Sequence, residues 1–130
     1  EIVAREDTSG EFQKSLEAAQ KILSENSDIV AIMCGNDQMA VAAKTALNLA
    51  GNDQTVVYSI DGSPDIKKEL KKADGQIAGT VAQSPVNIGK KAVDIALDIL
   101  EGKDFEKETS VDVFMINKEN VEMYGADGWQ

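Results

Sequence analysis

The fold of this chain is decided by the stretch Val56-Val57-Tyr58-Ser59-Ile60-Asp61-Gly62-Ser63-Pro64-Asp65. It opens as a short apolar run rich in β-branched residues and stops at an acid, a glycine and a proline. This pattern is typical of a buried strand that ends in a tight turn, with a helix beginning at Pro64. In a parallel sheet, the carboxyl ends of the strands face the ligand crevice. Asp61 is therefore predicted to be a polar group at the rim of a rigid sheet.

The same pattern, an apolar strand followed by a polar turn, occurs twice more. Residues 29–34 lead to Asn36, and residues 76–82 lead to Gln83. If the three strands are neighbours, Asn36, Asp61 and Gln83 lie along one edge of the sheet. An amide, a carboxylate and a second amide suit the recognition of hydroxyl groups, because together they offer donors and acceptors.

Each of these residues also has an ordinary local role available. Asn and Asp are favoured helix N-caps, so Asn36 or Asp37 could simply cap the helix that follows. Asp61 could form the turn before Pro64, and Gln83 could be a solvated turn residue. A ligand site is favoured by the coincidence of three strand ends that each offer a group matching a hydroxyl.

Hydrophobic periodicity predicts strands that alternate with helices. The expected strands are residues 1–4, 29–34, 55–60, 76–82 and 111–116, and the expected helices are 11–24, 36–50, 64–73 and 86–101, with one helical turn at 117–123. Such alternation indicates βαβ units, and continuous apolar strands are usually covered on both faces. We therefore expect an α/β fold, a parallel sheet with helices on both faces. The charged run 67–72 is expected to be a solvated helix face.

Composition narrows the classes of function. Lys plus Arg total 13 and Asp plus Glu total 23 among 130 residues, which gives a formal net charge of −10. This balance argues against nucleic acid and against an anionic membrane surface, because both need cationic contacts. The sequence contains no histidine, no glycine-rich phosphate loop and no Cys/His cluster. These features disfavour an enzyme and indicate no catalytic residues, cofactor or metal site. Cys34 is expected to be a small core residue.

The sequence shows no apolar run of the ~18 residues that a membrane-spanning helix needs. It begins at Glu1, in what has the pattern of the inside of a strand, and carries no recognisable signal peptide. We expect the chain to be a fragment or processed product, with any export signal upstream.

Three motifs together resemble a known family: Asn36-Asp37-Gln38-Met39-Ala40, Ile60-Asp61-Gly62-Ser63-Pro64-Asp65 and Gly79-Thr80-Val81-Ala82-Gln83-Ser84-Pro85. In order and spacing, and over nearly the whole chain, the sequence resembles the C-terminal half of a type I periplasmic sugar-binding protein, above all the ribose-type receptors of ABC transporters. The resemblance implies two similar lobes, joined by a three-strand hinge, that close on a sugar. Residues 1–83 would form the C-terminal sugar-binding lobe, and residues 84–130 the hinge-crossing helix, a returning strand and the tail.

The resemblance also implies ligand-binding roles and partners. Asn36, Asp61 and Gln83 would hydrogen-bond sugar hydroxyls, and Gln83 would do so from the hinge crossing. The partners would be a monosaccharide, a transporter permease, and the missing N-terminal lobe or a second copy of the chain, in a periplasmic or an extracellular, membrane-anchored location. Gly10 stands near a position where ribose-type members often carry an aromatic, and ribose, allose and psicose all remain open. The alternative is the effector-sensing core of a LacI-type transcription regulator, which shares the fold.

Overall fold

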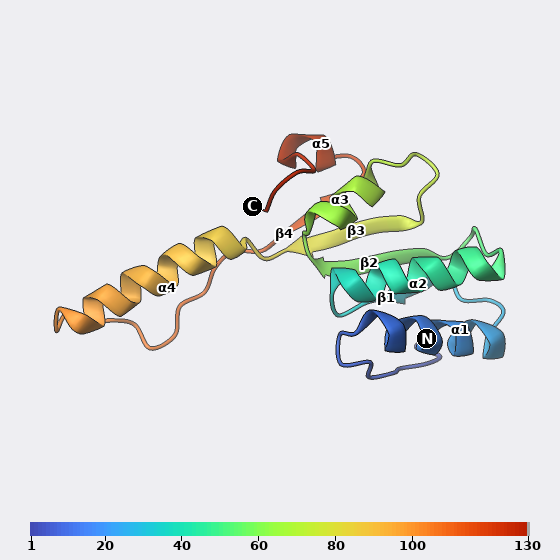
Figure 1. The fold of residues 1–130 in the computed structure, drawn as a ribbon, viewed down its shortest axis with the longest axis horizontal. Helices are drawn as coiled ribbons and strands as arrows, with labels where there is room; N and C mark the ends of the chain where they lie inside the picture. The colour runs from blue at the N-terminus through green and yellow to red at the C-terminus, as the bar shows by residue number, and fades with distance from the viewer. Residues whose placement is uncertain (130) are drawn as a thin grey trace.

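The computed structural model describes residues 1–129, which form a four-stranded sheet with helices packed beside it (Figure 1). The alternation of strands and helices confirms the predicted α/β class, and most bounds differ from expectation by only a few residues. In chain order the elements are α1 (Phe12–Glu25), β1 (Ala31–Met33), α2 (Asp37–Ala50), β2 (Val56–Asp61), α3 (Pro64–Leu70), β3 (Ile77–Ala82), α4 (Pro85–Leu100), β4 (Phe114–Asn117) and α5 (Val121–Tyr124).

The sheet has the order β1-β2-β3-β4, and its first three strands are parallel. The last strand is antiparallel, with Ala82 of β3 opposite Phe114 of β4 and Gly79 opposite Asn117. The direction of β4 follows from the path of the chain. The chain leaves the sheet at the carboxyl end of β3, runs out through α4, and re-enters at the same end.

The helices of the described residues cover one face of the sheet. Along β2, Val57 and Ser59 are buried, whereas Val56 and Ile60 point to the opposite face and are exposed. We expected helices on both faces. The structure differs because consecutive right-handed crossovers that step in one direction across a sheet place their helices on the same face. The core therefore lies between this face and helices α2 and α3.

The N-terminal segment does not form the strand expected at residues 1–4. Ile2 and Val3 are exposed, and the segment lies along β1 across an apolar groove of about 590 Å³ that is also lined by Val30 and Met33. Within residues 1–129 this segment has no strand to pair with, because the groove lies between it and β1, so its backbone groups form no ladder hydrogen bonds. Among these described residues, β1 is therefore an edge strand, paired with β2 on one side and with no strand on the side of the groove.

The charged run on α3 departs from expectation at one residue. Lys68, Lys71 and Lys72 are exposed as predicted, but Lys67 is fully buried. The Nζ atom of Lys67 donates a hydrogen bond to the carbonyl oxygen of Gly128 in the C-terminal tail. The tail therefore folds over α3, a long-range contact that helical periodicity does not show.

Helix α4 projects away from the sheet (Figure 1). It has no buried residue, and its apolar side chains include Val93, Leu97 and Leu100, all exposed. The chain thus does not fold this helix back on its own sheet. After α4 the chain returns, and Ile116 of β4 and Val121 of α5 rejoin the core. Within residues 1–129, no helix combines the length and the apolar character needed to cross a membrane.

The turn after β2 generates a test of the fold. Gly62 has φ +77°, and a Cβ there would lie 2.6 Å from the Cβ of Ala82. Gly62→Ala should lower the free energy of unfolding by about 2–4 kcal/mol, because a left-handed backbone and a steric clash both disfavour a side chain. Urea unfolding of the chain measures this change.

Gly51 is the matched control, because it has φ +65° but a Cβ added there would meet nothing within 4 Å. Gly51→Ala should cost only the backbone penalty of about 1–2 kcal/mol. Equal losses for the two variants would show that the close approach between Gly62 and Ala82 is absent in solution.

Candidate functional site

Two of the predicted site residues meet directly at the carboxyl ends of β2 and β3. Asp61 is the last residue of β2, and Gln83 follows β3. The Nε2 atom of Gln83 donates to Oδ1 of Asp61 at 2.8 Å, and the Gln83 backbone N–H donates to the Asp61 carbonyl oxygen at 3.3 Å. The expectation that parallel strand ends would bring these side chains together is confirmed in geometry.

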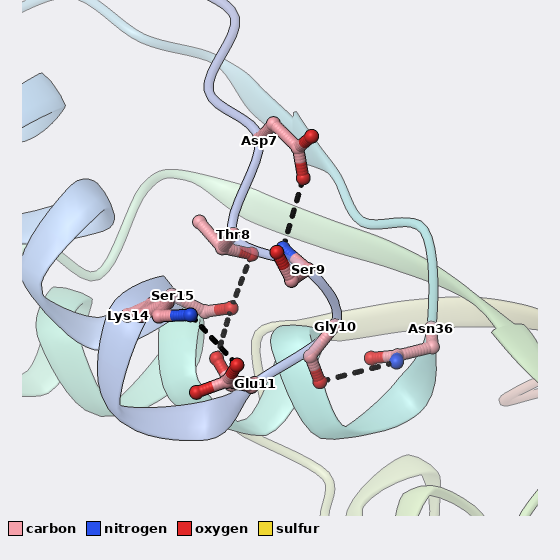
Figure 2. A network of polar contacts seen from close by, with 8 residues as sticks. All are labelled: Asp7, Thr8, Ser9, Gly10, Glu11, Lys14, Ser15 and Asn36. Carbon is pink, nitrogen blue, oxygen red and sulfur yellow. Dashed lines mark hydrogen bonds and ion pairs between the residues drawn. The ribbon is translucent and has the colours of Figure 1, made fainter.

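Asn36 performs the local role that the sequence left open. Its Oδ1 accepts a hydrogen bond from the Met39 backbone N–H at 2.8 Å, so it is the N-cap of α2. Its Nδ2 donates to the carbonyl oxygen of Gly10 at 3.3 Å (Figure 2). The next residue, Asp37, donates its backbone N–H to Oδ2 of Asp61 at 3.4 Å. Asn36 therefore stands at the same sheet edge as Asp61 and Gln83, but it is committed to capping.

The loop before α1 holds Gly10 against Asn36 (Figure 2). Thr8 and Ser15 share a hydroxyl hydrogen bond of 2.7 Å, and Ser15 also donates to the carbonyl oxygen of Glu11. Gly10 has φ +73°, and a Cβ there would lie 2.8 Å from Nδ2 of Asn36. A side chain at position 10 would thus displace the Asn36 amide, so the glycine is required by this close approach.

Sequence reasoning missed the role of Asp37, whose side chain is only 4% exposed. Its Oδ1 accepts from the hydroxyls of Ser59 on β2 and Thr80 on β3, and its Oδ2 accepts from the Ser63 backbone N–H at 2.6 Å. Ser59 and Thr80 are register partners on adjacent strands. The available signal was this pair of hydroxyl residues inside two otherwise apolar strands.

The backbone at this edge is strained. Asp61 has φ +131° and Ser84 has φ +51°, and both conformations disfavour residues with a side chain. Strained residues of this kind cluster at ligand sites and persist only where their surroundings hold them. Asp61 is the last residue of β2, and Ser84 precedes the first residue of α4.

Asp61 is a half-buried carboxylate whose proton affinity is set by opposing contacts. Burial raises the pKa of Asp61, and the nearby negative charge of Asp37 raises it further. Hydrogen bonds from the Asp37 backbone N–H and from Gln83 act in the other direction and lower the pKa. By contrast, Cys34 is buried in the core as expected, and burial raises the pKa of its thiol to about 11.

The site retains hydrogen-bonding capacity after its internal contacts are counted. A carboxylate accepts about four hydrogen bonds, and Asp61 accepts two within residues 1–129. Gln83 uses one side-chain N–H, and within the same residues its side-chain carbonyl oxygen accepts nothing. The pair therefore presents acceptors and a donor side by side, which is the chemistry that binds a polyol. Among residues 1–129 there is no group of three or more His, Cys, Asp or Glu placed to hold a metal ion.

The chain is similar to sugar-binding proteins in both sequence and structure. Residues 1–104 match the family described as periplasmic binding protein domain. The ribose import binding protein of Salmonella typhimurium is 34% identical over 118 residues, which are 91% of this chain and 39% of that protein. The chain thus spans about two fifths of the length of the curated relatives it matches.

Two solved structures carry bound polyols. A periplasmic solute-binding protein from Actinobacillus succinogenes with bound D-allose has a TM-score of 0.90 at 28% identity, covering 95% of this chain and 44% of its own. A solute-binding protein from Bacillus halodurans with bound myo-inositol has a TM-score of 0.88 at 28% identity, covering 97% and 43%. All three similar proteins are binding proteins by name, in agreement with the expectation that the chain is not an enzyme.

The contact between Gln83 and Asp61 generates a test by titration. Because the Gln83 donor lowers the pKa of Asp61, Gln83→Ala should raise that pKa. Carbon-13 NMR titration of the Asp61 carboxyl group measures the change. Gln13→Ala is the control, since it removes an amide donor from another carboxylate, that of Glu17 on α1. An Asp61 pKa that is the same with and without Gln83 would mean that the contact does not persist in solution.

Because the pKa of Asp61 is raised in the folded chain, the direction in which Asp61→Asn changes the pH dependence of stability can be predicted. A carboxyl group that holds its proton more tightly when folded stabilises the fold at low pH, and this contribution is lost as the pH rises through the folded pKa. Asp61→Asn removes the titrating group. The variant should therefore gain stability relative to the natural sequence as the pH rises through that range, as urea unfolding at several pH values would measure.

Proposed function

Because this chain belongs to the periplasmic binding protein domain family, we propose that it is the sugar-binding lobe of a receptor that takes up a monosaccharide for an ABC transporter. The observation that carries the proposal is the Asp61–Gln83 pair at the open sheet edge, next to Asn36. A sugar presents adjacent hydroxyls, each of which can donate and accept. Asp61 accepts from them with charge assistance, and Gln83 can both donate and accept.

We propose that the ligand is ribose-like. Support comes from a relative named for ribose import and from a similar structure with bound D-allose. Because another similar structure holds myo-inositol, the proposed range of ligands also includes cyclic polyols with several hydroxyls. The proposed roles are that Asp61 and Gln83 bind hydroxyls directly and that Asn36 adds its remaining amide hydrogen.

The receptor is proposed to have a second lobe, supplied by sequence outside residues 1–130. Residues 1–83 would form one lobe, and residues 84–130 would carry α4 across the hinge and bring β4 back. The exposed stripe of Val93, Leu97 and Leu100 supports this arrangement, since these side chains lie three or four residues apart on one helix side. Burial of apolar surface is worth roughly 25 cal/mol per Å², so such a stripe favours a partner.

The proposed location is the periplasm or, with a membrane anchor, the outer cell surface, and the proposed protein partner is a transporter permease. The names of the relatives support transport rather than regulation. A LacI-type regulator would instead carry a DNA-binding headpiece in the same gene product. The complete gene sequence distinguishes the two by a signal peptide or a headpiece upstream.

The sugar site should be weak on this lobe alone. Each direct hydrogen bond to an exposed ligand replaces one to water, so its net worth is about 0.5–1.5 kcal/mol. Fixing the ligand in place costs roughly 4 kcal/mol or more. Three residues on one open edge therefore leave little net affinity. A second lobe that closes over the sugar would exclude water and strengthen each contact.

Calorimetry on the complete two-lobe protein and on the 130-residue chain tests the proposal with D-ribose, D-allose, D-psicose and myo-inositol. Asp61→Ala should weaken binding by about tenfold or more, because a charged acceptor is lost and sugar hydroxyls are left unpaired. The 130-residue chain alone should bind about a hundredfold more weakly than the complete protein, or weaker still, by roughly the worth of two or three hydrogen bonds. Tight binding by the chain alone, or binding that survives Asp61→Ala, would contradict the site assignment.

Asn36→Asp separates ligand contact from helix capping. Asp caps a helix as well as Asn does, but it has no amide hydrogen to donate. The variant should keep the cap of α2, although it loses the Nδ2 hydrogen bond to the Gly10 carbonyl oxygen, and it should weaken sugar binding by less than Asp61→Ala does. Asn36→Ala, in contrast, should lose about 1 kcal/mol of stability with the cap.

Helix α4 generates a separate test of the second lobe. Leu97→Lys should weaken association of the chain, either with the other lobe or with a second copy, because it puts a charge in the exposed stripe. Asp94→Ala is the control, since it changes the charge of the same helix by the same amount. Sedimentation measures self-association and co-purification measures assembly with the other lobe. A chain that stays monomeric and binds the other lobe equally well with Lys at position 97 would contradict the role of α4.

A further inference from the structure

We propose that Asp37 is a positioning residue for the binding site: it does not touch the ligand, but it holds Asp61 where it can bind sugar hydroxyls. This inference rests on the proposed function, because it concerns the same site. Asp37 is only 4% exposed, so a ligand cannot reach it. Asp61, which accepts a hydrogen bond from the Asp37 backbone N–H, is half-buried and lies at the rim.

The Asp37 carboxylate joins three segments that are separate in sequence. Its Oδ1 accepts from Ser59 on β2 and from Thr80 on β3, the second at 2.8 Å. Its Oδ2 accepts from the backbone N–H of Ser63, the N-cap of α3, at 2.6 Å. These neutral donors stabilise its negative charge, as does the N-terminus of α2, where Asp37 is the first residue. Bonds to a charged acceptor are stronger than bonds between neutral groups.

The same network holds one polar group of each of the three residues 61–63 in the turn that carries Asp61. The Asp61 carboxylate accepts from the Asp37 backbone N–H. The Gly62 N–H donates to the Thr80 hydroxyl oxygen at 3.1 Å, and that hydroxyl gives its own hydrogen to Asp37. The Ser63 N–H donates to the Asp37 carboxylate directly. Three successive residues are thus fixed by Asp37 or by its partner Thr80.

The turn needs this support because its backbone is strained. Asp61 has φ +131°, which residues with a side chain rarely adopt, whereas the next residue, Gly62, takes its φ of +77° without strain because it is glycine. A non-glycine residue keeps such a conformation only where its surroundings over-determine it. Without the Asp37 carboxylate, the turn can relax, and the Asp61 side chain would leave both its contact with Gln83 and its place at the site.

Asp37→Asn is the direct test, because it keeps the size of the side chain and exchanges one acceptor oxygen for a donor. The new NH₂ group would either oppose the Ser63 N–H, donor against donor, or face the two hydroxyls, which would then have to accept from it. In the second case the Ser59 and Thr80 hydroxyl hydrogens lose their acceptor, and every remaining bond loses its charge assistance. In NMR spectra of the chain, the Ser63 amide should exchange with solvent about tenfold faster or more, and the signals of the Asp61 carboxyl and the Gln83 side-chain amide should shift. In the complete receptor, the Kd for D-ribose, D-allose or myo-inositol should rise about tenfold.

Two control variants distinguish positioning from stability alone. Ser59→Ala removes a donor to Asp37 whose hydroxyl, unlike that of Thr80, makes no hydrogen bond to residues 61–63. It should lower stability and leave the signals of Asp61 and Gln83 and the sugar affinity in place. Asp65→Asn removes a charge from the first turn of α3, next to the same turn, at a side chain that is 85% exposed. It should change neither the NMR signals of Asp61 and Gln83 nor the sugar affinity. If Asp37→Asn does not fold, Thr80→Val tests the same network, because it removes the hydroxyl that connects Asp37 to the Gly62 N–H.

The outcomes separate the two proposals. Displaced Asp61 and Gln83 signals in Asp37→Asn or Thr80→Val, but not in Ser59→Ala, would support positioning. Unmoved Asp61 and Gln83 signals with lowered stability and unchanged affinity would show that Asp37 only supports the fold. If the natural sequence in the complete receptor bound none of these sugars, the proposed function would be wrong, while the NMR comparison would still decide whether Asp37 holds the turn.

Discussion

The edge of the sheet depends on one constraint, the burial of the Asp37 carboxylate. A carboxylate removed from water is strongly disfavoured unless donors surround it. Here the donors come from β2, from β3 and from the turn before α3. Satisfying this one group therefore fixes the relative positions of two strand ends and of the N-termini of two helices. The polar rim of Asp61 and Gln83 is built on that buried layer.

Two acids near the same edge serve different purposes because their environments differ. Asp37 is buried, and its acceptor capacity is used by Ser59, Thr80 and Ser63. Asp61 is half-buried and accepts two hydrogen bonds within residues 1–129, so it can accept more from a bound molecule. The Asp37 carboxylate holds backbone and side-chain donors of the fold, whereas the Asp61 carboxylate can still accept hydrogen bonds from solvent or from a bound molecule. Gln83 donates one hydrogen bond to the Asp61 carboxylate, which can still accept others.

The architecture supports the proposal that one lobe is a scaffold for binding that would bind poorly alone. The site lies on an open edge where water competes for every hydroxyl contact. The same edge sends α4 away from the sheet with its apolar side chains exposed. Both features, an open polar rim and an uncovered helix, are explained by a second lobe that closes on the first. Family membership and the length of the relatives agree with this proposal.

The sequence alone determined four of the five expected strands, the α/β class and the polar residues at the strand ends, because apolar runs and turn residues act locally. It also offered Asn36 and Asp37 as alternative helix caps, a role that needs only the next few residues, and the structure shows Asn36 as the cap. Tertiary structure decided the rest. Asp37 became a buried hub because Ser59 and Thr80 lie opposite each other in the sheet, a register that no local pattern encodes. Lys67 is buried because the distant tail folds over it, and β4 runs antiparallel because the chain re-enters the sheet where it left. Such contacts depend on how segments pair across the fold, and periodicity within one segment carries no information about that pairing.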